Sequence, residues 1–124
     1  MAGSILVVDD DAAVRGLVVR ILRSWGHVAI SEAGSVAEAL RCAGAMHPDI
    51  VLVDIGLPDG DGFALTRELR TRFRALHVVI FSSDADRANA AAAERAGAVA
   101  FLPKDELSSP ARRRLLEGVA DGAG

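Results

Sequence analysis

Cysteine, aromatic residues and long apolar runs are all scarce in this sequence. Its 124 residues include one cysteine, one tryptophan, four phenylalanines and no tyrosine. Cys42 alone cannot form an internal disulfide, which is typical of a reducing compartment. No apolar run approaches the roughly 20 residues of a membrane helix, and the N-terminus lacks the basic and apolar stretches of a signal peptide. We therefore expect a cytoplasmic protein that does not contact a membrane.

Basic residues are too few for a surface that binds nucleic acid directly. The net charge is −3, and the only basic run, Arg112-Arg113-Arg114, is expected to form the solvated face of a terminal helix. Hydrophobic residues make up 51% of the chain, which is enough for one sizeable core. We expect residues 1–124 to form a single domain, with 121–124 as a frayed tail or a linker stub.

Short apolar runs alternate with helical periodicity along the whole chain. The predicted strands are 4–8, 27–33 (a weaker strand at an edge), 50–53, 76–81 and 99–102. The predicted helices follow Asp11 as far as Gly26, begin at Ser35 with a capping box to Glu38, run over 63–74, run from Asp84 or Asp86 to Gly97, and begin at Ser109-Pro110. Residues 56–62 are too rich in Gly, Pro and Asp for regular structure and are predicted to form a loop. This alternation predicts a parallel α/β sheet with helices on both faces.

Polar residues stand where four of these strands end. Asp9-Asp10 follow the first strand, Asp54 the third, Ser82 the fourth and Lys104 the fifth. Ligands of such sheets bind outside the carboxyl ends of the strands, so these side chains should converge on one edge. Lys104 is the only lysine among fourteen basic residues, and its compact ammonium can reach a single oxygen in a way that a planar guanidinium cannot.

Three clustered carboxylates repel each other unless a hard divalent cation such as Mg²⁺ lies among them. Asp11 is set apart as the expected N-cap of the first helix. A carboxylate beside a cation, an ammonium and a hydroxyl group is suited to phosphoryl transfer onto an aspartate. The three histidines are scattered and are expected to be ordinary loop or strand-end residues.

The chain resembles the receiver domains of bacterial two-component response regulators over residues 3–120. The matching segments are 5–11, 48–54, 57–62, Ser82 and 97–104. The resemblance implies a flavodoxin-like five-stranded parallel sheet of order 2-1-3-4-5. It also implies a signalling switch that catalyses its own phosphorylation and slow dephosphorylation, with a sensor histidine kinase or histidine phosphotransfer protein as phosphodonor. An output protein or fused output domain of unknown kind would follow, and phosphorylation-dependent homodimers are compatible with this role.

The resemblance further assigns roles to individual residues. Asp54 would accept the phosphoryl group, and Mg²⁺ (or Mn²⁺) would be bound by Asp10, Asp54 and the carbonyl of Gly56, with Asp9 acting largely through water. Lys104 would hold one phosphoryl oxygen and Ser82 would move to bond another. Rotation of Phe101 would then reshape the face made by helix four, strand five and helix five. Gly56 and Asp84 would overlook the water that hydrolyses the acyl phosphate.

The sequence departs from the family pattern at three places. Asp105 follows the lysine where proline is frequent, Ser83 is bulkier than the usual Ala or Gly, and Phe101 lacks the hydroxyl of the frequent Tyr.

Two other readings stay open at this point. One is a receiver fold used only as an interaction module, without phosphorylation. The other is a haloacid-dehalogenase-like phosphatase with Asp9 as nucleophile and Asp11 as acid/base, which leaves Asp54 without a role.

Overall fold

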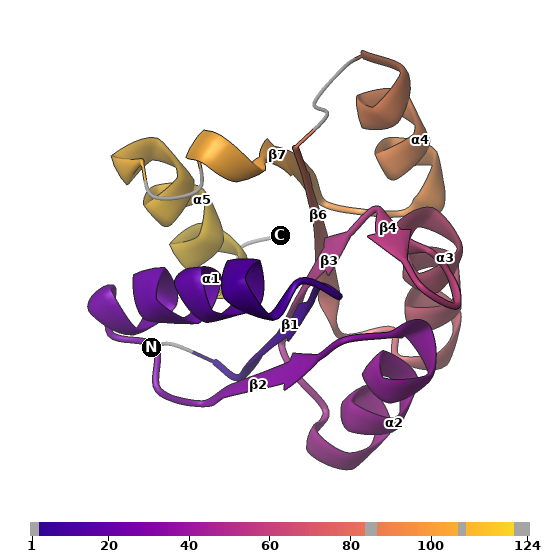
Figure 1. Ribbon diagram of the computed structural model, residues 1–124, viewed down its shortest axis with the longest axis horizontal. Coiled ribbons are helices and arrows are strands. Elements are labelled where there is room, and N and C mark those ends of the chain that lie inside the picture. The colour runs from indigo at the N-terminus through magenta and orange to yellow at the C-terminus, as the bar shows by residue number, and fades with distance from the viewer. Residues whose placement is uncertain (1–2, 84–86, 107–108, 121–124) are drawn as a thin grey trace.

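The five longer strands form one parallel sheet in the computed structural model, which describes residues 3–83, 87–106 and 109–120 (Figure 1). The strands are β1 (Ile5–Val8), β2 (Ile30–Ala33), β3 (Ile50–Asp54), β6 (His77–Ser82) and β7 (Ala100–Pro103). Their order in the sheet is β2-β1-β3-β6-β7, and all neighbours are parallel. The predicted order 2-1-3-4-5 is therefore confirmed, since β4 and β5 form a separate small hairpin.

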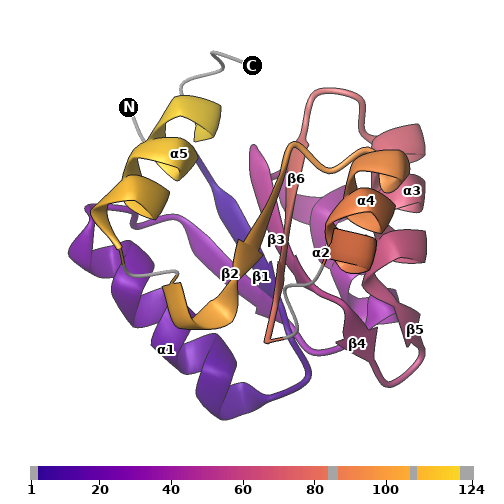
Figure 2. The same ribbon diagram turned by 90° about the horizontal axis from the view of Figure 1, so that it is seen from above.

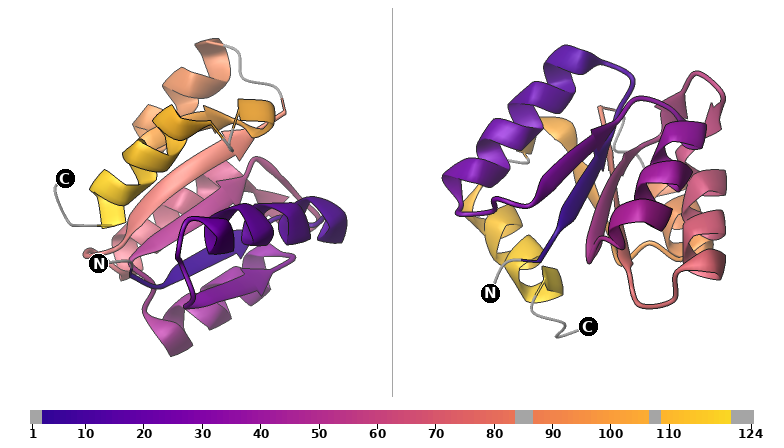
Figure 3. Two further views of the ribbon diagram at one scale, coloured as in Figure 1. Left: turned by 90° about the vertical axis from the view of Figure 1, so that its left-hand side faces the viewer. Right: turned by 90° about the horizontal axis from the view of Figure 1, so that it is seen from below.

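Helices cover both faces of the sheet (Figures 2 and 3). The helices are α1 (Ala12–Ser24), α2 (Val36–Met46), α3 (Gly62–Arg72), α4 (Arg87–Ala96) and α5 (Pro110–Ala120), with a short 3₁₀ turn, η1, at Lys104–Glu106. Buried residues of α1 and α5 share one core cluster, whereas those of α2, α3 and α4 share the other. Within the described part of the chain, no helix has the length and apolarity needed to cross a membrane.

The core consists mainly of aliphatic side chains, and successive residues of the central strands face opposite sides of the sheet. Ile5 and Val7 of β1 face the α1/α5 side, whereas Leu6 and Val8 face the α2/α3/α4 side. The first four residues of β3 are all buried, as expected for a strand covered on both faces. Phe81 is the one aromatic residue among the largest fully buried side chains.

Most predicted ends of strands and helices differ from the observed ones by one or two residues, and two predictions differ more. Main-chain hydrogen bonds explain the first of these two. The second strand begins at Ile30 and not at His27, because the N–H of His27 closes the end of α1 by donating to the carbonyl of Leu22. The N–H of Gly26 donates to the carbonyl of Arg23, and Gly26 adopts a positive φ of 96°. Gly26 therefore ends α1, as the sequence indicated, and the hydrogen bond of His27 extends this helix end by one residue.

The second wrong prediction concerns the loop at 56–62. It contains two short antiparallel strands, β4 (Gly56–Leu57) and β5 (Gly60–Asp61), and its last residue, Gly62, already begins α3. The predicted capping box at α2 is only half confirmed. Ser35 Oγ accepts a hydrogen bond from the N–H of Glu38, but the Glu38 carboxylate accepts from Gly34 and not from Ser35.

Asp84 and Asp86, the expected caps of α4, and the tail at 121–124 lie outside the described residues. In the terminal helix Arg113 and Arg114 are exposed, as predicted for a solvated face, and Arg113 pairs with Glu117 at 3.0 Å.

His27, in the segment that joins α1 to β2, is buried, with 2% of its surface exposed and no hydrogen-bond partner for either ring nitrogen. Burial, opposed by the charge of Glu117 and reinforced by that of Arg113, lowers the pKa of His27 below 6.5. The folded protein therefore keeps His27 neutral under conditions in which the unfolded chain protonates it. The resulting stability is present above pH 6.5 and is lost as pH falls below that value.

His27→Leu is expected to remove this pH dependence. At pH 8 the free energy of unfolding of the variant should lie within about 1 kcal/mol of the wild-type value, because an apolar side chain replaces an unsatisfied polar one of similar size. At pH 5.5 the variant should be the more stable protein. Urea unfolding at both pH values measures the difference, and an equal stability gap at pH 8 and pH 5.5 would show that His27 does not titrate with folding.

Candidate functional site

The parallel sheet brings the predicted polar residues to one edge. Asp54 is the last residue of β3 and Ser82 the last of β6, while Asp9 follows β1 and Lys104 follows β7. The strand register aligns these ends, with Val8 opposite Val53, Asp54 opposite Phe81, and Ser82 opposite Pro103. The convergence predicted from the strand ends is therefore present.

Three carboxylates form a compact group at this edge. Asp9, Asp10 and Asp54 each offer an oxygen, and these oxygens lie within 4.8 Å of one another. Asp9 is fully buried, Asp54 is half-buried and Asp10 is exposed, so the group is open to solvent on one side. Three carboxylate oxygens at this spacing fit a hard cation that keeps some of its water, such as Mg²⁺.

Lys104 lies between two of these carboxylates. Its Nζ is 2.8 Å from Oδ2 of Asp9 and 3.2 Å from Oδ1 of Asp54, and it lies 5.1 Å from the ring centroid of Phe81. The lysine side chain is 20% exposed and that of Asp54 is 13% exposed. The one lysine of the chain thus neutralises part of the acidic group, and the aromatic ring beneath it limits its access to water.

The two groups nearest the centre have shifted pKa values. Burial raises the pKa of Asp54, the charge of Asp9 adds to the shift, and Lys104 opposes it. Burial alone would lower the pKa of Lys104, but its hydrogen bond to Asp9 and the charges of Asp54 and Asp9 outweigh burial, so that pKa is raised. The Lys104 ammonium interacts mainly with Asp9, which is the closer carboxylate. The negative charge of Asp54 is therefore only partly balanced by Lys104.

The segment after β1 is fixed by main-chain and side-chain contacts. Asp9 Oδ1 accepts from the N–H of Asp11, and Asp11 Oδ1 accepts from the N–H groups of Ala13 and Val14, as predicted for the N-cap of α1. The Arg15 Nη1 donates to the Asp9 carbonyl at 2.6 Å, and its Nε lies 3.1 Å from Glu32 of β2. Sequence reasoning missed Arg15, because no local pattern pairs residues 15 and 32.

The segment after β3 turns sharply back on itself. The N–H of Gly62 donates to the carbonyl of Ile55 at 2.7 Å, and Asp61 caps α3 through the N–H of Ala64. A Cβ added to Gly62 would overlap the carbonyl oxygen of Asp54, whereas one added to Gly56 would meet nothing within 4 Å. Glycine at 62 is therefore required by close approach to the backbone of Asp54.

The resemblance also implied roles for three residues outside the acidic group, and the structure describes two of them, Ser82 and Phe101. Ser82 is 5% exposed at the end of β6. Phe101 is half-buried against the α2/α3/α4 core cluster and borders a hollow of about 340 Å³ between α4 and β7. Asp84 lies outside the described residues. Among those residues no peptide bond is cis, so the Lys104–Asp105 bond is trans.

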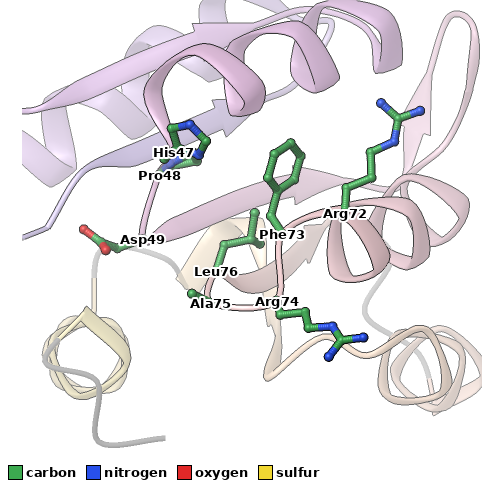
Figure 4. A pocket seen from close by; sticks show the side chains of 8 residues that line it. All are labelled: His47, Pro48, Asp49, Arg72, Phe73, Arg74, Ala75 and Leu76. Carbon is green, nitrogen blue, oxygen red and sulfur yellow. The ribbon is translucent and has the colours of Figure 1, made fainter.

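Two further hollows lie on the surface. One of about 330 Å³ lies between α1 (Val14, Leu17 and Ile21) and Lys104-Asp105. Another, of about 390 Å³, lies at the opposite end of the sheet around Phe73 (Figure 4). There His47 meets the Phe73 ring edge-on, while Arg72 and Arg74 extend away from that ring, so the polar groups do not converge.

Comparison with known proteins gives a consistent match. The family model described as "Response regulator receiver domain" matches residues 5–115. The protein-glutamate methylesterase/protein-glutamine glutaminase 6 of Anaeromyxobacter dehalogenans (strain 2CP-C) is 40% identical over 94% of this chain and 34% of its own length. The KDP operon transcriptional regulatory protein KdpE of Escherichia coli (strain K12) is 34% identical over 82% of this chain and 44% of its own length.

A solved structure agrees with these sequence matches. The receiver domain of NtrX from Brucella abortus has 34% identity and a TM-score of 0.78, with 97% of each chain covered. This chain spans less than half of either curated relative, so the likeness concerns one domain of those proteins. The matched region contains the acidic group, the lysine and the whole sheet, and the chain therefore belongs to the receiver domain family of two-component response regulators.

Proposed function

We propose that residues 1–124 form a single receiver domain that switches by Mg²⁺-dependent transfer of a phosphoryl group from a phosphohistidine to Asp54. The observation that carries this proposal is the placement of Lys104 Nζ within 3.2 Å of both Asp9 and Asp54, beside the exposed carboxylate of Asp10. Each charged group needed to bind a cation and a phosphoryl group is present at one edge of the sheet.

The carboxylates of Asp10 and Asp54 and the carbonyl of Gly56 would hold the cation, with Asp9 acting largely through water. Among the described residues, Lys104 is the cation that pairs with Asp54, and a bound metal ion would supply further positive charge to the phosphoryl oxygens. Mn²⁺ has the same preference for oxygen ligands and could replace it.

In the transfer step a carboxylate oxygen of Asp54 attacks the phosphorus in line with the bond to the histidine nitrogen. The new O–P bond forms as the P–N bond breaks, and the electron pair of that bond stays on the imidazole. The Lys104 ammonium is free to leave Asp54 for a phosphoryl oxygen, because it keeps its shorter contact to buried Asp9.

The response to phosphorylation would pass through β6 and β7. The Ser82 hydroxyl would bond a second phosphoryl oxygen, and Phe101 would repack in the space beside α4, reshaping the face made by α4, β7 and α5. Phe101 has no hydroxyl, so this motion would depend on packing alone. Asp84 and the side-chain-free Gly56 would set the rate of acyl phosphate hydrolysis.

The local contacts weigh against the phosphatase reading. Asp9 is fully buried and bound to Lys104, while the carboxylate of Asp11 caps α1 and is occupied by two main-chain N–H groups. Asp54, which that reading leaves without a role, is the more accessible carboxylate beside the lysine. Mapping of the phosphoryl group after treatment with acetyl phosphate separates the interaction-module reading from a phosphorylated switch.

The partner upstream would be a sensor histidine kinase or a histidine phosphotransfer protein. Downstream, the relatives differ: one is named as a methylesterase/glutaminase and another as a transcriptional regulator. We infer an output protein or a fused output domain whose type the receiver residues do not specify, and phosphorylation-dependent pairing of two copies is compatible with this role.

Mg²⁺ is expected to stabilise the folded protein. A cation that binds only the folded state raises stability by mass action, so 10 mM MgCl₂ should raise Tm by about 2–5 °C. Asp10→Ala should lose most of this response. Asp11→Ala is the matched control, since it removes an adjacent carboxylate that caps α1; it should lower Tm but keep the Mg²⁺ shift. Equal Mg²⁺ shifts in wild type and Asp10→Ala, measured by thermal unfolding, would place the cation elsewhere.

Lys104→Arg is expected to separate phosphorylation from its consequence. A guanidinium is too wide to place one donor where the ammonium lies, between Asp9 and Asp54. Asp54 should still be modified, but the chemical-shift changes at Ser82 and Phe101 on adding beryllofluoride should fall below about half of the wild-type values. Wild-type changes in the variant would show that any cation at position 104 transmits the signal.

A further inference from the structure

The loop after Asp54 is fastened to a helix from a different part of the chain. Asp59 lies in the turn between β4 and β5, and its two carboxylate oxygens accept hydrogen bonds from the backbone N–H groups of Val36 and Ala37, at 2.7 and 3.0 Å. These N–H groups belong to the first turn of α2, where no intrahelical acceptor exists for them. The same two hydrogen bonds lower the pKa of Asp59, so it is a full anion at a helix N-terminus.

α2 already has a cap of its own. Ser35 accepts from the N–H of Glu38, and Asp59 takes the two N–H groups that Ser35 leaves open. The turn also lies close against the helix, since a Cβ added to Gly60 would be 3.2 Å from Cγ2 of Val36. Ser35 therefore caps α2 locally, whereas Asp59 joins α2 to the loop that follows β3.

The loop itself has little else to fix its orientation. β4 and β5 are two residues each, with Gly56 paired to Asp61 and Leu57 to Gly60, and a hairpin this short is not stable alone. Gly56, Gly60 and Asp61 are exposed, and only Leu57 packs partly against the core. The ends of the hairpin are held beside Asp54 by the hydrogen bond from Gly62 to Ile55, so the contact of Asp59 with α2 is its far anchor.

We propose that Asp59 is a positioning residue for the cation site. By holding the β4–β5 turn against α2, it fixes the orientation of Gly56, three residues before it, whose carbonyl would be a ligand of the cation beside Asp10 and Asp54. This inference rests on the proposed function, because it takes the cation to bind beside Asp54 and Gly56. Outer contacts that orient ligands change metal affinity without touching the metal.

The test is a titration of the ¹⁵N-labelled protein with MgCl₂, followed through the amide signals of residues 9, 10, 54 and 56. We expect Asp59→Ala to raise the Kd for Mg²⁺ by about 3- to 10-fold. This effect is smaller than is usual for residues that orient metal ligands, because Asp59 acts on one ligand of several. Amide exchange of Gly62 should become faster in the same variant. Asp59→Asn keeps one carbonyl acceptor for α2 and should give an intermediate Kd.

Ser35→Ala is the matched control, since it removes the other cap of α2 and leaves the loop anchor intact. It should lower thermal stability about as much as Asp59→Ala while its Kd for Mg²⁺ stays within about twofold of wild type. An unchanged Kd in Asp59→Ala, or an equal rise in Ser35→Ala, would overturn the inference while leaving the cation site itself in place. A wild-type protein whose signals do not respond to Mg²⁺ would instead overturn the cation site, and the positioning role with it.

Discussion

Asp54→Asn is expected to abolish phosphorylation and, in the same variant, to stabilise the metal-free protein. The amide cannot form an acyl phosphate, so the rate of phosphoryl incorporation from acetyl phosphate with Mg²⁺ should fall at least about 100-fold. This corresponds to an increase of about 2.7 kcal/mol in the activation barrier. Stability should rise because Asp54 is 13% exposed and lies beside buried Asp9, so its charge is unfavourable in the absence of a cation.

The pH dependence of stability distinguishes this gain from a general packing effect. The pKa of Asp54 is raised in the folded state, first by burial and then by Asp9, so the folded protein binds this proton more tightly than the unfolded chain. The associated stability is present below pH 3.8 and is lost as pH rises through the folded pKa. Urea unfolding without Mg²⁺ should therefore show Asp54→Asn and wild type diverging above that window, with the variant more stable. A variant less stable than wild type at pH 7 would show that the charge of Asp54 is well compensated by Lys104.

Gly62→Ala is expected to destabilise the protein by about 2–3 kcal/mol, because the new methyl group must displace the backbone of the site. Its Cβ would overlap the carbonyl oxygen of Asp54 and lie 3.0 Å from the carbonyl carbon of Asp54 and from Cα of Ile55. Backbone atoms cannot rotate away as a side chain can, so β3, the turn or α3 has to shift. Moving the main chain of Asp54 should also weaken Mg²⁺ binding.

Gly56→Ala provides the control for Gly62→Ala within the same loop. Its Cβ would meet nothing within 4 Å, so we expect its stability to lie within about 0.5 kcal/mol of wild type. Chemical unfolding of both variants measures the contrast. Comparable stability of the two would mean that the loop yields to the added methyl group without moving Asp54.

The alternation of strands and helices and the identity of the acidic group could be predicted because both depend on short-range patterns, whereas the order of the strands was implied by the resemblance to receiver domains. Buried runs such as 5–8 and 50–53 mark strands, and in a parallel sheet their carboxyl ends must meet, which places Asp9, Asp54 and Lys104 together. The sequence misled where one local pattern was compatible with two different structures. His27 to Ala29 have a strand-like composition, yet the N–H of His27 is used to end α1.

The contacts that hold the site in place could not be predicted in the same way. Arg15 reaches Glu32 across 17 residues, and Asp59 reaches α2 across more than 20, so no spacing within one element encodes either contact. Asp59 also stands in a segment whose Gly, Pro and Asp content indicated only an irregular loop. Such pairs depend on how two loops meet after the sheet has formed, and that is a property of the tertiary structure.

The position of the phosphoryl group tests the central claim most directly. The wild-type protein is treated with acetyl phosphate in the presence and absence of Mg²⁺, reduced with borohydride, and mapped by peptide mass spectrometry, since reduction converts an aspartyl phosphate to homoserine. We predict homoserine at position 54 only when Mg²⁺ is present. Homoserine at position 9 would indicate the phosphatase reading, and its absence from every position, with acetyl phosphate or with a phosphorylated histidine protein as donor, would contradict a phosphorylated switch.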